Sequence, residues 1–224
     1  VAANMRFAFT EIHKKFTSQT GFSVLPVYGS SGKLVTQIRN GAPFDIFISA
    51  DVGFADSICN SKLNSTEPRI YAYGKLVLWT LKSYDLSKGI FLLNDSTIKT
   101  IAIGDLKLTS YGPAAKGILK TANLWYSLTS KMIFGENITR VAQFIASGSA
   151  DIGFSAKSLV LSEEMRNKGK WVDIDSSLYE PIPQAALILT NGEKHDTAAV
   201  HALYNFIYSK ESRNILVRYG YGVP

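Results

Sequence analysis

Runs of apolar residues alternate along the chain with segments in which apolar residues recur at helical spacing. Runs rich in apolar and β-branched residues, short and without polar interruptions, predict strands that are buried on both faces. Six segments fit this description: 22–28 (FSVLPVY), 44–50 (FDIFISA), 75–80 (KLVLWT), 100–104 (TIAIG), 151–156 (DIGFSA) and 185–189 (AALIL).

Between these runs lie amphipathic segments that predict helices. Phe9, Ile12 and Phe16 fall on one helical face, and Gly21 follows as a helix stop. The same pattern precedes two further glycines and recurs near the C-terminus, with apolar residues at Leu34, Val35 and Ile38, at Val141, Phe144 and Ile145, and at Leu203, Phe206 and Ile207. Strands that alternate with helices favour an α/β fold with mainly parallel sheets.

The order of these elements predicts two lobes. The runs 75–80 and 185–189 are far apart in the sequence, and the segment between them has strands and helices of its own. Two α/β lobes joined by two extended crossing strands would give this pattern. We therefore predict lobe 1 at 1–78 plus 187–224 and an inserted lobe 2 at 79–186.

Composition describes an ordinary globular protein. Of the 224 residues, 46% are apolar and 19% are charged, which is enough apolar material for a substantial core. No apolar run approaches the roughly 18–20 residues that span a bilayer. The N-terminal VAANMRFAF lacks the basic and then apolar pattern of a signal peptide, so we expect none in this chain. The single Cys59 occupies an apolar helical position and is expected to be a buried thiol.

The net charge of +6 does not indicate nucleic-acid binding. Basic residues are scattered, and no basic helix or aromatic ladder accompanies them. Enzyme signatures such as HExxH, CxxC, GxSxG or a phosphate-binding loop do not occur. Carboxylates at strand ends are expected to cap the helices that follow them, and the three histidines are expected on the surface; these residues are Asp45, Asp51, Asp105, Asp151, His13, His195 and His201.

Small polar residues gather instead where strands lead into helices. Asn4, Ser31, Tyr111 (after Ser110) and Ile138 (after Asn137) stand at four such junctions. The first turn of a helix has N–H groups without internal partners and carries a partial positive charge, so each junction suits an anion. Sites made only of neutral donors would favour a small, fully ionised oxyanion. An anion that keeps a proton would find no hydrogen-bond acceptor for that proton there.

Five segments resemble ordered landmarks of the periplasmic molybdate-binding proteins of the ModA type, the solute-binding components of molybdate ABC importers. They are GSSGKLVTQIRNGAPFDIFISAD (29–51), YAYGKLVLWT (71–80), SYGPAAKGIL (110–119), ASGSADIGFSA (146–156) and YEPIPQAALIL (179–189). The resemblance runs from Val1 to Pro224, and the first block is its most specific part. It implies a fold of the type II periplasmic-binding-protein class, with a ligand cleft between two lobes.

The resemblance also implies a set of oxyanion ligands. Ser31 is expected to donate through its hydroxyl and its N–H, while Tyr111 and Ile138 donate through their N–H groups. Asn4 matches the polar residue that ends the first strand. Ala3 beside it, Ser30 in the same GSSG turn and Tyr179 near the second crossing strand complete the candidates. The sequence departs from the family pattern at two of these junctions: Ala3 stands where relatives can carry a hydroxyl, and LTSYG replaces an APYG-like turn.

The resemblance implies a binding protein and not an enzyme. Its ligand would be molybdate, and also tungstate, with no cofactor and no metal held directly by side chains. Its partner would be an ABC transporter permease in the membrane, and the protein would be a periplasmic or lipid-anchored monomer that binds no nucleic acid. Alternatives are a binder of another ligand, such as sulfate, phosphate or a ferric complex, or the effector domain of a transcription regulator.

Overall fold

The computed structural model describes residues 1–224, which divide into two compact units. Unit 1 consists of Val1–Tyr73 and Pro183–Pro224, and unit 2 is the continuous segment Gly74–Ile182. The unit boundaries therefore fall near 73/74 and 182/183, compared with 78/79 and 186/187 in the sequence prediction. No helix has the length and apolar character needed to cross a membrane.

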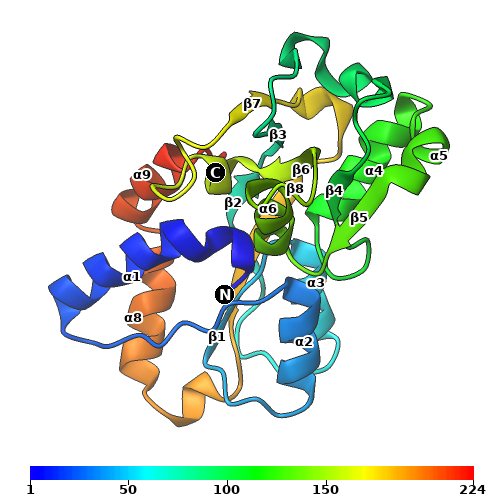
Figure 1. Ribbon diagram of the computed structural model, residues 1–224. Coiled ribbons are helices and arrows are strands. Elements are labelled where there is room, and N and C mark those ends of the chain that lie inside the picture. Colours follow the sequence, from blue (N-terminus) through cyan, green and yellow to red (C-terminus); the bar gives the residue numbers. More distant parts are fainter. The chain divides into compact units, whose positions relative to one another are not determined.

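Unit 1 contains a three-stranded sheet with strand order β1-β8-β2 and helices around it (Figure 1). Strand β1 pairs antiparallel with β8, and Phe47 is opposite Leu187. The elements are η1 (Ala3–Met5), α1 (Arg6–Thr20), α2 (Ser31–Arg39), β1 (Ile46–Ile48), α3 (Val52–Cys59), β2 (Arg69–Gly74), β8 (Ile182–Ile188), η5 (Gly192–Lys194), α8 (Thr197–Ile207) and α9 (Lys210–Arg218).

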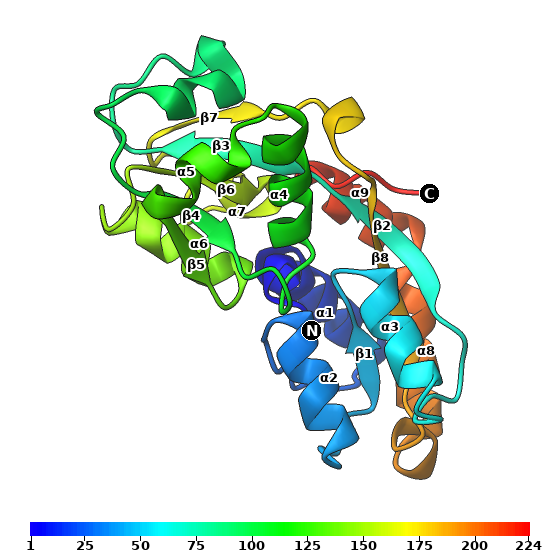
Figure 2. The same cartoon turned by 90° about the vertical axis from the view of Figure 1, so that its right-hand side faces the viewer.

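This small sheet has helices on both faces, which explains the apolar character of β1 and of the AALIL segment of β8. Successive residues of a strand point to opposite faces. Phe47 and Leu187 belong to a core with α2 and α3, which lie side by side next to β1 in Figure 2. Ile48 and Ile188 belong to a second core with α1, α8 and α9.

Unit 2 is built on a five-stranded sheet with strand order β5-β4-β6-β3-β7. Strand β4 pairs in parallel with β5 and β6, whereas β3 pairs antiparallel with β6 and β7. The elements are β3 (Leu76–Thr80), η2 (Leu86–Asn94), β4 (Ile101–Gly104), α4 (Tyr111–Thr121), α5 (Trp125–Leu128), η3 (Thr129–Lys131), β5 (Met132–Gly135), α6 (Ile138–Ala146), β6 (Ile152–Ala156), α7 (Lys157–Val160), β7 (Lys170–Asp173) and η4 (Ser176–Leu178).

Five of the six predicted strands are present, as β1, β3, β4, β6 and β8. The prediction of a strand at 22–28 was wrong: the segment makes no ladder, and only Gly29 beyond it forms a single bridge with Ala2. Pro26 has no N–H to donate to a ladder, and Leu25 is 93% exposed although it lies in an apolar run. The predicted helices are present as α1, α2, α6 and α8, and Gly21 takes the left-handed conformation at the end of α1. The α/β prediction is confirmed, with parallel pairing around β4 and antiparallel pairing around β3.

Candidate functional site

In unit 1, hydrogen bonds join three turns that precede helices. Ala2 donates its N–H to the carbonyl of Ile48 at 2.8 Å, and Ala3 donates to the carbonyl of Gly29 at 2.9 Å. The segments leading into η1, α2 and α3 therefore end next to one another. Four of the sequence-predicted candidates, Ala3, Asn4, Ser30 and Ser31, therefore lie on two neighbouring turns.

Ser31 is the first residue of α2, and its hydroxyl is placed to donate a hydrogen bond. Its hydroxyl oxygen accepts the N–H of Ala50 at 3.0 Å, and the side chain is buried. Because that oxygen already accepts from the backbone, the hydroxyl proton can be directed at another acceptor. Ser30 is the N-cap, since its hydroxyl accepts the N–H of Lys33 at 3.4 Å. The N–H groups of Ser31 and Gly32 have no acceptor within the helix.

Asn4 has a side chain that is committed to a buried polar network of unit 1. Its Nδ2 donates to Gln184 Oε1 at 2.9 Å and to the hydroxyl of Tyr221 at 3.0 Å. The Tyr221 hydroxyl donates to the Asn4 carbonyl at 2.8 Å, and the Tyr71 hydroxyl donates to Gln184 Oε1 at 2.9 Å. These hydrogen bonds of Asn4 fix the turn on which Ala3 also lies.

Sequence reasoning missed the partners of Asn4 in this network. One signal was present for Gln184: a polar amide stands inside the apolar run of β8, and its side chain is completely buried. A buried amide must find hydrogen-bond partners, so its position marked a polar site. No comparable signal distinguishes Tyr71 or Tyr221 from the other tyrosines of the chain.

In unit 2, the strands β4 and β5 bring two helix starts to the same edge of the sheet. The strands are parallel, and their last residues, Gly104 and Gly135, are partners in the register. Asp105 donates its N–H to the carbonyl of Gly135 at 2.9 Å, which joins the two turns directly. The starts of α4 at Tyr111 and of α6 at Ile138 follow these turns.

Most backbone N–H groups at the start of α4 have acceptors within the protein or are absent. Thr109 Oγ1 accepts the N–H of Gly112 at 3.0 Å, and the Ser110 carbonyl accepts the N–H of Ala114 at 3.5 Å. Pro113 has no N–H, as is favourable near a helix start. Tyr111, which is buried, heads the helix.

The start of α6 is capped by Asn137. Its side-chain oxygen accepts the N–H of Arg140 at 2.9 Å, and its carbonyl accepts the N–H of Val141 at 3.2 Å. Ile138 is the first helical residue and is buried, and the helix offers its N–H no acceptor.

Glycines permit the close approach of these turns. A Cβ on Gly112 would overlap the carbonyl oxygens of Gly104 and Asp105, the latter at 2.7 Å. A Cβ on Gly135 would lie 2.8 Å from the N atom of Val141. Side chains at these positions would push the helix starts away from the strand ends.

Tyr179 has a hydroxyl that is already engaged in unit 2. It accepts the N–H of Leu76 at the start of β3, at 3.2 Å. Burial raises the pKa of the Tyr179 hydroxyl, so this group is neutral at physiological pH. Its hydrogen bond ties the segment before β8 to β3.

The carboxylates at strand ends serve the fold. Asp51 caps α3 by accepting the N–H of Gly53 at 2.7 Å, and Asp105 accepts the N–H groups of Lys107 and Leu108 at 2.8 and 2.9 Å. Asp151 accepts the N–H of Lys99 and of Thr100 and pairs with Lys82. Only Asp51 therefore caps the helix that follows it, as predicted. The prediction of capping was wrong for Asp105, whose contacts lie within its own turn, and for Asp151, which precedes a strand.

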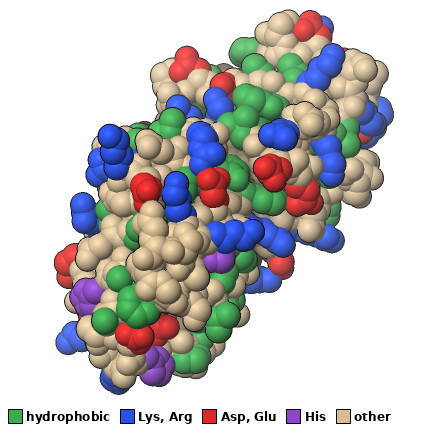
Figure 3. Space-filling model, turned by 90° about the vertical axis from the view of Figure 1, so that its left-hand side faces the viewer, with side chains coloured by type: hydrophobic (Ala, Val, Ile, Leu, Met, Phe, Trp, Pro, Cys, Tyr) green, Lys and Arg blue, Asp and Glu red, His purple; other side chains and the backbone are tan.

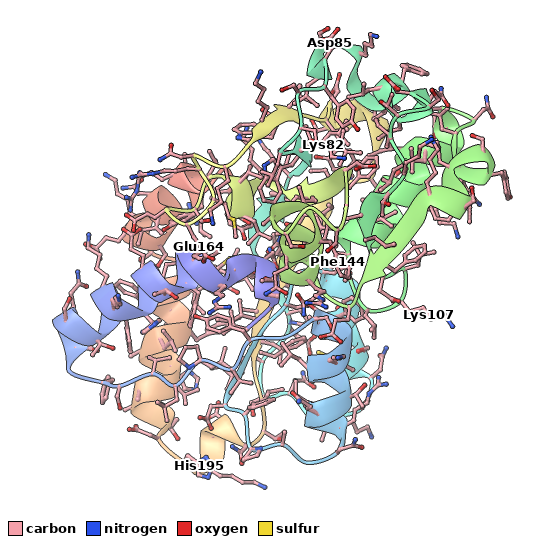
Figure 4. The ribbon with its side chains drawn as sticks, in the orientation of Figure 1. Lys82, Asp85, Lys107, Phe144, Glu164 and His195 are labelled. Atoms are coloured by element: carbon pink, nitrogen blue, oxygen red, sulfur yellow. The ribbon has the colours of Figure 1, made fainter.

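Asp45 precedes strand β1 and caps no helix, so the prediction of capping was wrong here too. Asp45 accepts from Asn191 at 3.1 Å and lies 3.2 Å from His195 Nδ1, in the turn before α8 where Figure 4 labels that histidine. The chain has no group of three His, Cys, Asp or Glu side chains placed to hold a metal ion. On the face shown in Figure 3, Lys and Arg are dispersed among acidic and apolar side chains.

Comparisons with known proteins identify the family of the chain. Residues 1–222 match the family described as bacterial extracellular solute-binding protein. The molybdate-binding protein ModA of Azotobacter vinelandii is 34% identical over 224 residues, with 100% of this chain and 88% of the relative covered. ModA of Rhodobacter capsulatus is 34% identical over 223 residues, with coverage of 99% and 86%. The solved structure of the Azotobacter vinelandii periplasmic molybdate-binding protein superimposes with a TM-score of 0.92 at 28% identity, covering 100% of this chain and 97% of that one.

The fold is that of a solute-binding protein with type II periplasmic-binding architecture. The chain belongs to the bacterial extracellular solute-binding protein family, as a member of its ModA type. The predictions of family and of a binding protein rather than an enzyme are thereby confirmed.

Proposed function

We propose that this protein binds molybdate, and also tungstate, through hydroxyl and N–H donors and delivers the anion to an ABC transporter permease. The observation that supports this most directly is Ser31, whose buried hydroxyl accepts from Ala50 and so presents its proton at the start of α2. The names of the ModA relatives point to the same ligand. The proposed ligands are Asn4, Ser31, Tyr111 and Ile138, and Ala3 lies beside Asn4.

The chemistry of these donors favours a dianion without a proton. N–H groups only donate, so a ligand that keeps a proton, such as hydrogen phosphate, finds no acceptor for it. A charge-assisted hydrogen bond contributes about 1.5–3 kcal/mol net. Several of them are sufficient for micromolar binding, which corresponds to about 8 kcal/mol. Sulfate carries the same charge, so we propose that fit to the longer Mo–O and W–O bonds separates the ligands.

Isothermal titration of the purified protein with molybdate, tungstate, sulfate and phosphate tests this proposal. We expect saturable one-to-one binding of molybdate and tungstate, and binding of sulfate and phosphate that is weaker by at least about a hundred-fold. No heat with molybdate and tungstate, at concentrations up to the millimolar range, would contradict the proposed function. If sulfate bound more strongly than molybdate, sulfate would become the proposed ligand, and the argument from neutral donors would still apply.

The partner and the compartment follow from the same proposal. A protein of this family that captures an oxyanion would act outside the cytoplasmic membrane, free in the periplasm or lipid-anchored, as a monomer. Reconstitution with the cognate permease in liposomes measures delivery: molybdate-loaded protein should stimulate ATP hydrolysis, and a Ser31→Ala variant should do so only at much higher molybdate concentration. Equal stimulation by both proteins at low molybdate would argue against the role of Ser31.

A further inference from the structure

Ser110 is a buried polar residue at the start of α4 whose hydroxyl has no partner within the protein. The residue is 8% exposed, and its Oγ is enclosed without a hydrogen bond. A buried hydroxyl without a hydrogen bond is unfavourable by about 1–3 kcal/mol relative to a satisfied one. Such groups are uncommon in folded proteins, and each requires an explanation.

Helix capping does not explain the Ser110 hydroxyl. An N-cap serine normally has extended backbone angles and accepts a first-turn N–H with its side chain. Ser110 instead has helical angles, with φ −79° and ψ −27°, and makes no side-chain cap. Thr109 performs this role, since its Oγ1 accepts the Gly112 N–H and its hydroxyl donates to the Asp105 carbonyl at 2.9 Å.

The carboxylate of Asp105, at the start of the same loop, accepts from other donors. The Asp105 side chain accepts the N–H groups of Lys107 and Leu108 within its own turn. The hydroxyl of Ser110 therefore lies at a helix start, where partial positive charge attracts anions, and has no protein acceptor. Ser30 and Ser31, at the corresponding position in unit 1, both have hydrogen-bonded hydroxyls.

We propose that the Ser110 hydroxyl is an additional donor to the bound oxyanion at the start of α4. This inference rests on the proposed function and extends its ligand set, because Tyr111 was expected to contribute only its N–H at this junction. When the anion binds, Ser110 gains the acceptor that the protein does not supply. Its hydrogen bond is charge-assisted, and no protein hydrogen bond has to be broken to form it.

A pair of serine substitutions in unit 2 tests this proposal. Ser110→Ala removes a hydroxyl that has no protein partner. Ser162→Ala removes a fully buried hydroxyl that donates to the Leu159 carbonyl at 2.7 Å. Titration calorimetry gives the molybdate affinity of each variant and of the wild type, and thermal unfolding without ligand gives their stability.

The two variants should behave in opposite ways. Ser110→Ala should bind molybdate about ten-fold or more weakly, with a melting temperature without ligand that is equal to or above that of the wild type. Ser162→Ala should melt at a lower temperature and bind with unchanged affinity. Wild-type affinity in Ser110→Ala, or a loss of its stability without ligand as large as that of Ser162→Ala, would overturn the inference. Failure of the wild type itself to bind molybdate or tungstate would instead reject the proposed function.

Discussion

The two units prepare their helix starts in different ways. In unit 1 the turn residues are held by side chains: Ser31 accepts from Ala50, and Asn4 is tied to Gln184 and Tyr221. In unit 2 the side chains of Thr109 and Asn137 cap the helices, but the turns also depend on backbone that packs closely, at Gly112 and Gly135. Both arrangements fix neutral donors before a ligand arrives, so little reorganisation is needed on binding.

The difference shows that two kinds of substitution can damage a site built from neutral donors. A side-chain network fails when one polar atom is removed, because its partner is left buried without a hydrogen bond. A closely packed backbone is insensitive to the chemistry of its side chains but fails when a Cβ is added. Substitutions can therefore be chosen that affect one unit and leave the other intact.

The largest effect is expected from Gly112→Ala in unit 2. The added Cβ would overlap the carbonyl oxygens of Gly104 and Asp105, so backbone atoms between β4 and α4 would have to shift. We expect a loss of about 3 kcal/mol or more in the free energy of unfolding, together with strongly weakened molybdate binding. Urea denaturation and calorimetry measure the two quantities.

Gly117→Ala is the matched control in the same helix. A Cβ at Gly117 would meet no atom within 4 Å, so the change should stabilise the helix by about 0.5–1 kcal/mol. If both glycine variants unfolded alike, close backbone packing would not be what holds the start of α4.

The second-largest effect is expected from Ser31→Ala in unit 1. The substitution removes a hydroxyl donor to the anion and leaves the Ala50 N–H without its acceptor. Molybdate affinity should fall by about ten- to a hundred-fold, and stability by about 1–3 kcal/mol.

Ser209→Ala separates ligand binding from capping. Ser209 caps α9 by accepting the N–H of Ser212 at 3.1 Å. Its loss should lower stability by about 1 kcal/mol and leave affinity unchanged. Equal affinities for the Ser31 and Ser209 variants would contradict the assignment of Ser31.

Much of this architecture could be predicted from the sequence because its strands are buried on both faces. Runs such as DIGFSA and AALIL have no polar alternation, and they became β6 and β8. The segment 22–28 has the same apolar character, yet Pro26 and the lack of neighbouring strand partners leave it outside the sheet. The strands β2, β5 and β7 were missed: RIYAYG begins with a charged residue, KWVD has one at each end, and MIFG is short.

The candidate site was predictable at its helix starts but not in its supporting contacts. The small residues of GSSG and SYGP marked the starts of α2 and α4 locally in the sequence. The partners of Asn4 lie 180 and 217 residues away, at Gln184 and Tyr221, and only the fold brings them together. The expectation that Asn4, Ser31, Tyr111 and Ile138 act as ligands remains a prediction.

A smaller effect is expected from Tyr221→Phe, which tests the side-chain network of unit 1. The Tyr221 hydroxyl accepts from Asn4 Nδ2 and donates to the Asn4 carbonyl. Its removal should cost about 1–2 kcal/mol of stability and weaken molybdate binding a few-fold, because the Ala3–Asn4 turn loses its support. Tyr126→Phe, at a tyrosine that is 83% exposed, is the control and should change neither quantity. Unchanged affinity in Tyr221→Phe would show that the network supports folding alone.

The smallest effect on binding is expected from Asp151→Asn, which removes a buried charge of unit 2 that we assign to the fold. Burial raises the pKa of Asp151, but hydrogen bonds from Lys82 and from the N–H groups of Lys99 and Thr100 outweigh it, so the pKa is lowered. A carboxyl with a lowered folded-state pKa stabilises the protein fully above its ordinary value of about 3.9, and this contribution is lost as the pH falls through the folded-state pKa. The wild type should therefore exceed Asp151→Asn in stability at pH 7, by about 1–3 kcal/mol, and the difference should shrink below about pH 4. Urea denaturation between pH 2.5 and 7 measures this difference, while molybdate affinity at pH 7 should be equal in the two proteins. A weaker affinity in Asp151→Asn would mean that the strand-end carboxylates of unit 2 also govern how its helix starts bind the anion.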